Sequence, residues 1–179
     1  MHVIGVDEAL AKTGLVVLNQ NGVIKTDVIK TDSKMLDVKR LIAIRNQVEG
    51  YASQYKPDLV AFEGIAFMGW MAPEIHGVLD ILGVKLFEMN CRYVIVAPSR
   101  LKKYACGKGN AKKDMVRKDA YKKWSVEFES LDVTEAFVLA KIAEAVWQIK
   151  NEIKKIDEFL VYEQDVLKEL IKEVVTNYG

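Results

Sequence analysis

The sequence predicts an α/β protein in which a five-stranded mixed sheet carries helices on both faces. Two observations predict it. Three β-branched segments open the chain, over residues 3–7, 13–19 and 23–31, and segments of helical period then alternate with two further short apolar segments. The opening segments form a meander, because Asn21-Gly22 separates the second from the third as a hairpin turn does.

Helical spacing of apolar residues and the positions of proline and glycine predict the remaining elements. Pro57 follows the first helical pattern and ends it, while Pro73 suits the first turn of the second helix. The glycine-containing residues 106–110 are expected to form a loop. We therefore expect helices over residues 35–55, from about 72 or 73 to 89, and over about 112–124, with strands over 59–62 and 93–96 and one or two amphipathic helices over 143–178.

Length and composition favour one domain. The chain has 179 residues, 50% of them hydrophobic, which suffices for a sizeable core. We expect a core over residues 1–146 and a C-terminal helical extension of the same domain over 147–179. Cys91 and Cys106 are expected to be packed or free thiols, and no apolar run approaches the roughly 18 residues of a membrane span, so a cytoplasmic protein is expected.

Basic residues are concentrated in one segment. The formal net charge is only +1, yet residues 100–123 contain ten lysines and arginines against two aspartates. A basic segment around a glycine-rich loop is typical of a surface that follows a phosphate backbone, and a solvated charged face is the alternative. The candidate DNA-binding residues are Arg100, Lys102, Lys103, Lys108, Lys112 and Lys113.

Four acidic residues lie at positions that suit a metal-dependent nuclease. Asp7 and Glu63 each end an apolar strand segment, while Asp132 and Glu135 open the helical run that begins at Ala136. Charge avoids such places unless it is paired or bound to a metal. Residues three apart project from one face of a helix, so the second pair can act together.

Oxygen-only ligands suit Mg²⁺, and two such ions can activate a water and neutralise the leaving oxygen in phosphodiester hydrolysis. We expect Asp7 to bridge two Mg²⁺ ions, with Glu63 on one and Asp132 and Glu135 on the other. Mn²⁺ is expected to substitute for Mg²⁺.

Taken together, these motifs resemble those of the RuvC-type Holliday junction resolvases, the phage-encoded members in particular. The resemblance rests on Ile4-Gly5-Val6-Asp7, Thr13-Gly14, Ala61-Phe62-Glu63, the segment 109–113 and the Asp132-x-x-Glu135 spacing. It implies a ribonuclease H-like fold, with residues 1–146 as the nuclease core, a homodimer, and Mg²⁺-dependent cutting of paired strands in branched DNA. By position, Lys102 and Lys113 match basic residues at the edge of the family's active site.

The chain departs from the cellular members of that family. They have Pro-Gly where this chain has Glu8-Ala9, and an aspartate where it has Glu135. The family's base-contacting phenylalanine falls at Ala66, with Phe67 one residue later. Phe67 is a candidate to wedge between unstacked base pairs, or else packs in the core or a dimer. Glu8 is expected to be solvated.

Other interpretations stay open. Asp132-x-x-Glu135 also fits a helix capping box, and Asp7 and Glu63 also fit turn or loop carboxylates. The Asp7-to-Thr13-Gly14 pattern also occurs in the phosphate hairpin of actin/hexokinase-type ATPases, although those need a second such domain. A non-catalytic nucleic-acid-binding module on the same fold is the other alternative.

The expected activity is therefore a structure-selective DNA endonuclease that resolves four-way junctions and other branched DNA such as forks. A two-fold symmetric junction favours a symmetric dimer. We expect the second helix to form its interface, because its apolar residues exceed one core face and two glycines would allow close approach. These residues are Met71, Ile75, Val78, Leu79, Leu82 and Leu86, with Gly77 and Gly83.

Overall fold

The computed structural model describes residues 1–64 and 73–176 of the chain. The strands are β1 (His2–Asp7), β2 (Lys12–Asn19), β3 (Gly22–Lys30), β4 (Leu59–Glu63) and β5 (Tyr93–Val96). The helices are α1 (Asp37–Tyr55), α2 (Pro73–Glu88), α3 (Pro98–Cys106), α4 (Lys113–Trp124), α5 (Leu131–Lys150) and α6 (Val161–Leu170), with a short 3-10 helix η1 (Ile156–Glu158).

The five strands form one mixed sheet in the order β3-β2-β1-β4-β5. The first three strands are an antiparallel meander, and β4 and β5 continue parallel to β1. β1 is therefore central and flanked on both sides, which is why its residues from Val3 to Asp7 are all buried. The predicted five-stranded mixed sheet is confirmed.

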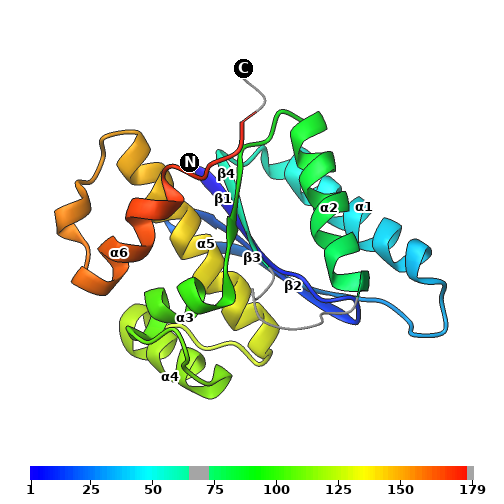
Figure 1. Cartoon of the computed structure of the whole chain (residues 1–179), viewed down its shortest axis with the longest axis horizontal. Helices are drawn as coiled ribbons and strands as arrows, with labels where there is room; N and C mark the ends of the chain where they lie inside the picture. Colours follow the sequence, from blue (N-terminus) through cyan, green and yellow to red (C-terminus); the bar gives the residue numbers. More distant parts are fainter. Residues whose placement is uncertain (65–72, 177–179) are drawn as a thin grey trace.

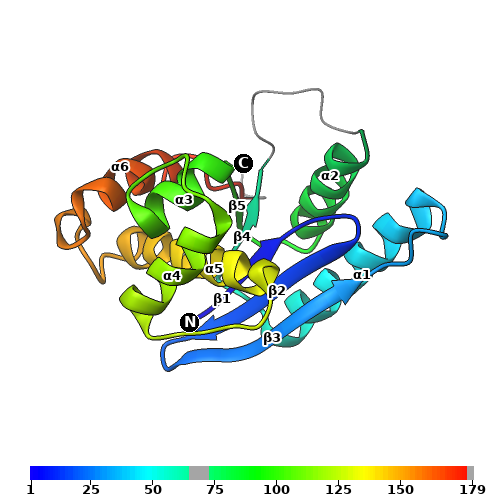
Figure 2. The same cartoon turned by 90° about the horizontal axis from the view of Figure 1, so that it is seen from below.

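Helices cover both faces of this sheet. Figures 1 and 2 show α1 and α2 on one face, and α5 with α3, α4 and α6 on the other. Side chains of β1 alternate between the two layers: Val3 packs in the α5 cluster, while Ile4 and Val6 pack in the cluster that contains α1 and α2. Complete burial of one such side chain contributes about 1.5–3 kcal/mol.

Helix α5 lies directly on β1 because a glycine faces it. A Cβ atom added to Gly5 would lie 2.0 Å from the carbonyl oxygen of Ala136 and 2.4 Å from the backbone nitrogen of Ala140. No side chain fits between these backbones. The close approach fixes the height of α5 above the sheet, and with it the position of the residues at the start of the helix.

The structure adds a helix that the sequence pattern did not predict. Residues 98–106, expected as part of a basic connection, form α3 with Pro98 at the start and Gly107 as its left-handed C-cap. Leu101, Tyr104 and Ala105 form its buried face. The basic segment thus forms two short helices, α3 and α4, around the predicted loop.

The prediction that the apolar residues of α2 form a dimer interface is wrong in part, because several of them are buried within the chain. Val78, Leu82 and Leu86 are at most 1% exposed and pack inside this same chain. Gly77 and Gly83 face side chains of α1 and β5, so they serve packing within the chain. Met71 lies outside the described residues, as does the side chain of Ile75.

The C-terminal extension packs beside α3 and the edge of the sheet. α5 continues through the expected boundary at residues 146/147 and ends at Lys150. α6 then buries Val166, Leu167 and Leu170 in the α5 cluster, and Val175 forms an antiparallel bridge with Tyr93 of β5. No helix in the described part of the chain is long and apolar enough to cross a membrane.

Candidate active site

Asp7 and Glu63 meet because they end adjacent parallel strands. Val6 and Phe62 are the last pair of the β1–β4 ladder, so the next residue of each strand emerges at the same edge of the sheet. Asp7 is only 5% exposed. Its side chain donates a hydrogen bond to Glu63, so the two carboxyl groups share a proton.

Glu135 reaches the same place from the start of α5. Gly14 pairs with Asp7 in the β1–β2 ladder, and a Cβ atom on Gly14 would lie 2.2 Å from the carbonyl oxygen of Asp132. The glycine thus lets the first turn of α5 touch β2 beside Asp7. Glu135, one turn later, is 2% exposed and acts electrostatically on both Asp7 and Glu63. We call Asp7, Glu63 and Glu135 the carboxylate site.

Two lysines border the carboxylate site. Lys113, at the first residue of α4, places its Nζ 2.5 Å from Oε2 of Glu135. Its side chain is 56% exposed, whereas that of Glu135 is 3% exposed, so the ammonium group lies between the buried acid and solvent. Lys102 of α3 acts on Glu63. The structure therefore brings together the two lysines that the resemblance singled out.

Crowding of buried acids raises their affinity for protons. Burial, then the charges of Glu63 and Glu135, raise the pKa of Asp7 to about 9. The pKa of Glu63 is also raised, mainly by burial, although the hydrogen bond from Asp7 and the charges of Lys113 and Lys102 oppose the rise. Burial alone would lower the pKa of Lys113, yet the hydrogen bond and charge of Glu135 give it a net rise. The site strongly favours added positive charge.

Asp132 lies in the first turn of α5. Ser130 is the N-cap of α5, makes no side-chain cap bond, and leaves Asp132 at the second helical position. The capping-box interpretation of Asp132 and Glu135 is therefore wrong. Among the described residues, the main charges that shift the pKa of Asp7 and Glu63 do not include that of Asp132. Electrostatic interactions thus link three of the four predicted carboxylates, and Asp132 lies three residues before Glu135 on the same helix.

The donor set fits a hard divalent cation. It offers carboxylate oxygens without histidine or cysteine, and these buried acids lack enough positive charge to balance them. Within residues 1–64 and 73–176, however, no three acidic, histidine or cysteine side chains form a ready-made metal cluster. Lys113 and the shared proton occupy the carboxylate oxygens instead.

Comparison with known proteins matches this site to a family. Residues 3–142 match the family model described as crossover junction endodeoxyribonuclease RuvC. The chain belongs to the RuvC family. The matched range contains all four predicted carboxylates and the basic segment, and it ends before the C-terminal extension.

Curated relatives and solved structures agree with this membership. A RuvC from Paenarthrobacter aurescens is 29% identical over 126 residues, 66% of this chain and 66% of that protein. One from Mycobacterium ulcerans is 32% identical over 65% of this chain and 67% of its own length, so these alignments span about two thirds of each relative. The Thermus thermophilus RuvC structure matches with a TM-score of 0.68 at 22% identity, covering 78% of this chain and 91% of its own, which confirms the predicted ribonuclease H-like fold.

This RuvC-family chain contains a further buried acid that sequence reasoning missed. Glu8 was expected to be solvated, and this was wrong: it is only 8% exposed. The signal was present in the alternation of β1, because Glu8 continues the buried face of Ile4 and Val6 at a spacing of two. Burial, then the charges of Glu63 and Asp7, hold its pKa well above the ordinary range.

The predicted DNA-binding residues have different surroundings. Lys108 and Lys112 are exposed around the loop between α3 and α4. Arg100 and Lys103 instead pair with acids of the C-terminal extension, Glu173 at 2.6 Å and Asp165 at 2.9 Å. Phe67 lies outside the described residues. Sequence patterns could not show these ion pairs, because their partners lie more than sixty residues away along the chain.

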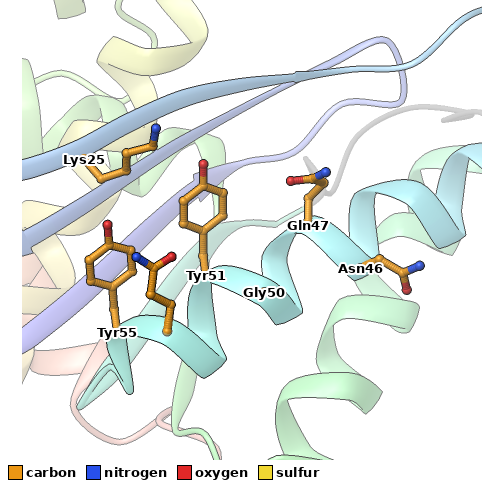
Figure 3. A pocket seen from close by; sticks show the side chains of 7 residues that line it. Lys25, Asn46, Gln47, Gly50, Tyr51 and Tyr55 are labelled. Atoms are coloured by element: carbon orange, nitrogen blue, oxygen red, sulfur yellow. The ribbon is translucent and has the colours of Figure 1, made fainter.

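A surface hollow of about 430 Å³ lies away from the carboxylate site, between α1 and β3 (Figure 3). Tyr51, Tyr55 and Lys25 point into it. The hydroxyl of Tyr51 donates to Asp27 at 2.5 Å, and the two tyrosine rings stack on each other. These polar groups are engaged within the chain, and no acid of the carboxylate site lines the hollow.

Proposed function

We propose that this chain is a divalent-metal-dependent endonuclease that cuts four-way DNA junctions. The observation that carries the proposal is the convergence of Asp7, Glu63 and Glu135 at one edge of the sheet, with Lys113 against Glu135, in a chain of the RuvC family. Curated RuvC relatives are crossover junction endodeoxyribonucleases, and a T. thermophilus RuvC of the same fold has been solved with a Holliday junction substrate.

The carboxylates are proposed as the metal ligands. Asp7 and Glu63 offer oxygens from neighbouring strands, Glu135 offers oxygens from α5, and Asp132 adds a carboxylate at the helix start. When bound, Mg²⁺ ions, or Mn²⁺ in their place, would supply an activated water and neutralise the leaving oxygen. Loading the site requires the proton shared by Asp7 and Glu63 to leave and Lys113 to release Glu135, because both now occupy ligand oxygens.

Lys113 has a second proposed task once it releases Glu135. Its side chain is more than half exposed, so its ammonium group is accessible to a phosphate oxygen of DNA placed at the site. Lys102, which acts on Glu63 from α3, borders the site from the other basic helix. These two lysines are proposed to hold the scissile phosphate over the carboxylate site. Arg100, Lys103, Lys108, Lys112 and Phe67 are the proposed contacts to the flanking DNA.

A homodimer is the proposed assembly, since two opposed strands must be cut. In α2, Val84 is 60% exposed and Phe87 is 43% exposed, and these replace the buried leucines as the proposed contact residues. The predicted location is the cytoplasm, which is that of a bacterial host cell if the protein is phage-encoded. Activity on forks also stays a prediction.

A cleavage assay tests the proposed function. A four-way junction, a fork and a plain duplex, each labelled on individual strands, are incubated with the protein in Mg²⁺, in Mn²⁺ and in EDTA. We expect paired cuts on opposed strands of the junction with either metal, no cuts in EDTA and little cutting of duplex. Junction binding without cutting in either metal would instead identify a non-catalytic binding module. Equal cutting of junction and duplex would show that the enzyme is not structure-selective.

A further inference from the structure

Within the described part of the chain, Glu8 is a buried acid near the carboxylate site to which neither the family comparison nor the proposed ligand set gives a task. It directly follows Asp7 at the end of β1 and is 8% exposed. Among residues 1–64 and 73–176, its buried Oε2 atom has no hydrogen-bond partner. Other buried acids of the described chain are partnered: Glu135 by Lys113, and Glu163 by Lys123.

The surroundings of Glu8 are those of the strand ends. Its carboxylate faces backbone N–H groups of Glu8 itself and of Glu63, and the nearest charges acting on it are those of Glu63 and Asp7. Glu8 therefore lies against the Asp7–Glu63 pair. Ile4 and Val6 of β1 pack in the α1/α2 cluster, and Glu8 continues their spacing of two, one residue past the end of β1. This spacing assigns Glu8 to the α1/α2 side of the sheet, whereas Glu135 belongs to α5 on the opposite face.

The described part of the chain satisfies neither protonation state of Glu8. As a carboxylate, Oε2 would be a buried charged acceptor without a donor. As a carboxylic acid, the same atom would be a donor without an acceptor. A buried polar group in this condition destabilises the fold, and a charged one destabilises it more. An external positive group at the strand ends would remove this cost.

We propose that Glu8 is a fifth carboxylate of the metal site, which offers Oε2, directly or through one water, to a divalent cation held at Asp7 and Glu63. This inference rests on the proposed function, since it assigns Glu8 to the same metal. It predicts that the cation is contacted from both faces of the sheet edge, by Glu135 on one side and Glu8 on the other.

Calorimetric titration with Mn²⁺ alone, without DNA, tests the inference. The variants are Glu8→Gln, Asp7→Asn and Glu163→Gln, the last being a matched control that alters a buried, lysine-paired glutamate outside the site. We expect Asp7→Asn to lose measurable binding and Glu8→Gln to bind about tenfold more weakly than the unmodified chain. Glu163→Gln should bind Mn²⁺ as the unmodified chain does.

Thermal unfolding gives a second readout that is independent of activity. Removal of an unpartnered buried acid should leave the metal-free unfolding temperature of Glu8→Gln, or of the similarly sized Glu8→Met, equal to or above that of the unmodified chain. The rise caused by a fixed Mn²⁺ concentration should be smaller in both variants, because weaker binding stabilises less. A merely structural Glu8 predicts the reverse: a lower metal-free unfolding temperature and an unchanged Mn²⁺-induced rise.

The outcomes separate this inference from the function on which it rests. If Glu8→Gln and Glu8→Met bind Mn²⁺ as tightly as the unmodified chain while Asp7→Asn does not bind, the inference is overturned and the proposed function stands. If the unmodified chain itself does not bind Mn²⁺ or Mg²⁺, both fail together.

Discussion

Charge balance among a few side chains determines the state of the carboxylate site. Glu135 is almost completely buried, and the ammonium group of Lys113 pairs with it at 2.5 Å. Asp7 and Glu63 reduce their mutual repulsion by sharing a proton. A cation that enters this site would therefore replace positive charge that the chain now supplies itself.

Lys113→Ala should destabilise the metal-free protein by roughly 1–3 kcal/mol, because it leaves the buried Glu135 without its partner. Added Mg²⁺ should restore part of that loss, since the cation would take the place of the ammonium group. Urea unfolding with and without Mg²⁺ measures both effects. Lys118→Ala, which removes an exposed lysine from the same helix, is the control. Equal stability of the two variants would mean that Lys113 does not support Glu135.

Sequence reasoning could predict part of this site and not the rest. Asp7 and Glu63 are predictable because each ends a continuous apolar strand. Asp132 and Glu135 look equivalent in sequence, and only the folded chain shows that Glu135 is buried and acts on Asp7. The shared proton and the Lys113 ion pair depend on three elements that meet only in the folded chain.

At the scale of elements, the contact of α5 with β1 and β2 decides where Glu135 lies. Gly5 and Gly14 permit that contact, because an added Cβ would meet backbone atoms of α5 at 2.0 Å and 2.2 Å. Backbone cannot move aside as a flexible side chain can, so the helix itself would have to shift.

Gly5→Ala should lower the free energy of unfolding by about 1–3 kcal/mol and displace Glu135 from Asp7. Gly50→Ala in α1 is a control with the opposite sign, because nothing lies within 4 Å of its added Cβ. A mid-helix alanine there should stabilise by about 0.5–1 kcal/mol. Denaturant unfolding of both variants provides the comparison, and a Gly5→Ala protein as stable as the unmodified chain would contradict the described contact.

The C-terminal extension is the second element-scale feature, because its acids pair with bases of α3. We expect Asp165→Asn to free Lys103 for phosphate and to raise junction affinity by a small factor, up to about fivefold, because an exposed ion pair is weak. The salt dependence should steepen by about 0.9 if one phosphate contact is gained. Binding titrations over a range of salt concentrations measure both.

Glu169→Gln is the matched control for this test. It removes one negative charge from the same helix, but its partner is Lys172 of the extension itself. Equal effects of the two substitutions would show that only the net charge of the extension matters. The pairing was not predictable from sequence, since α3 was not recognised as a helix and its basic residues gave no sign of which acids they would meet.

At the scale of the whole molecule, the order of strands and helices was predictable and the surface left for a partner was not. Period-two and helical patterns predicted the meander, both parallel strands and the main helices of each face, but not α3. The apolar stripe of α2 suggested a dimer surface, yet Val78, Leu82 and Leu86 are buried because they pack on the sheet and α1. Periodicity shows that a helix has an apolar face, and only the fold shows what covers it.

Val84→Glu should weaken the proposed dimer, because Val84 is the most exposed large apolar side chain of α2 described. Val38→Glu in α1 is the matched control, since Val38 is 57% exposed and lies on a different helix. Sedimentation at micromolar concentration should give a dimer for the unmodified chain and for Val38→Glu, and a folded monomer for Val84→Glu. A dimer that withstands Val84→Glu would place the interface elsewhere.

The central claim is that the carboxylate site cuts DNA while the basic segment binds it. Asp7→Asn tests this most directly, because it removes one ligand charge from the site and leaves the basic segment untouched. Junction binding and strand-resolved junction cleavage are measured in Mg²⁺ on the same preparation. The account predicts no detectable cutting by Asp7→Asn. It also predicts a junction affinity within about twofold of that of the unmodified chain, which is a much smaller change than the ~1.4 kcal/mol of a tenfold loss. Substantial cutting by Asp7→Asn in Mg²⁺ would contradict it.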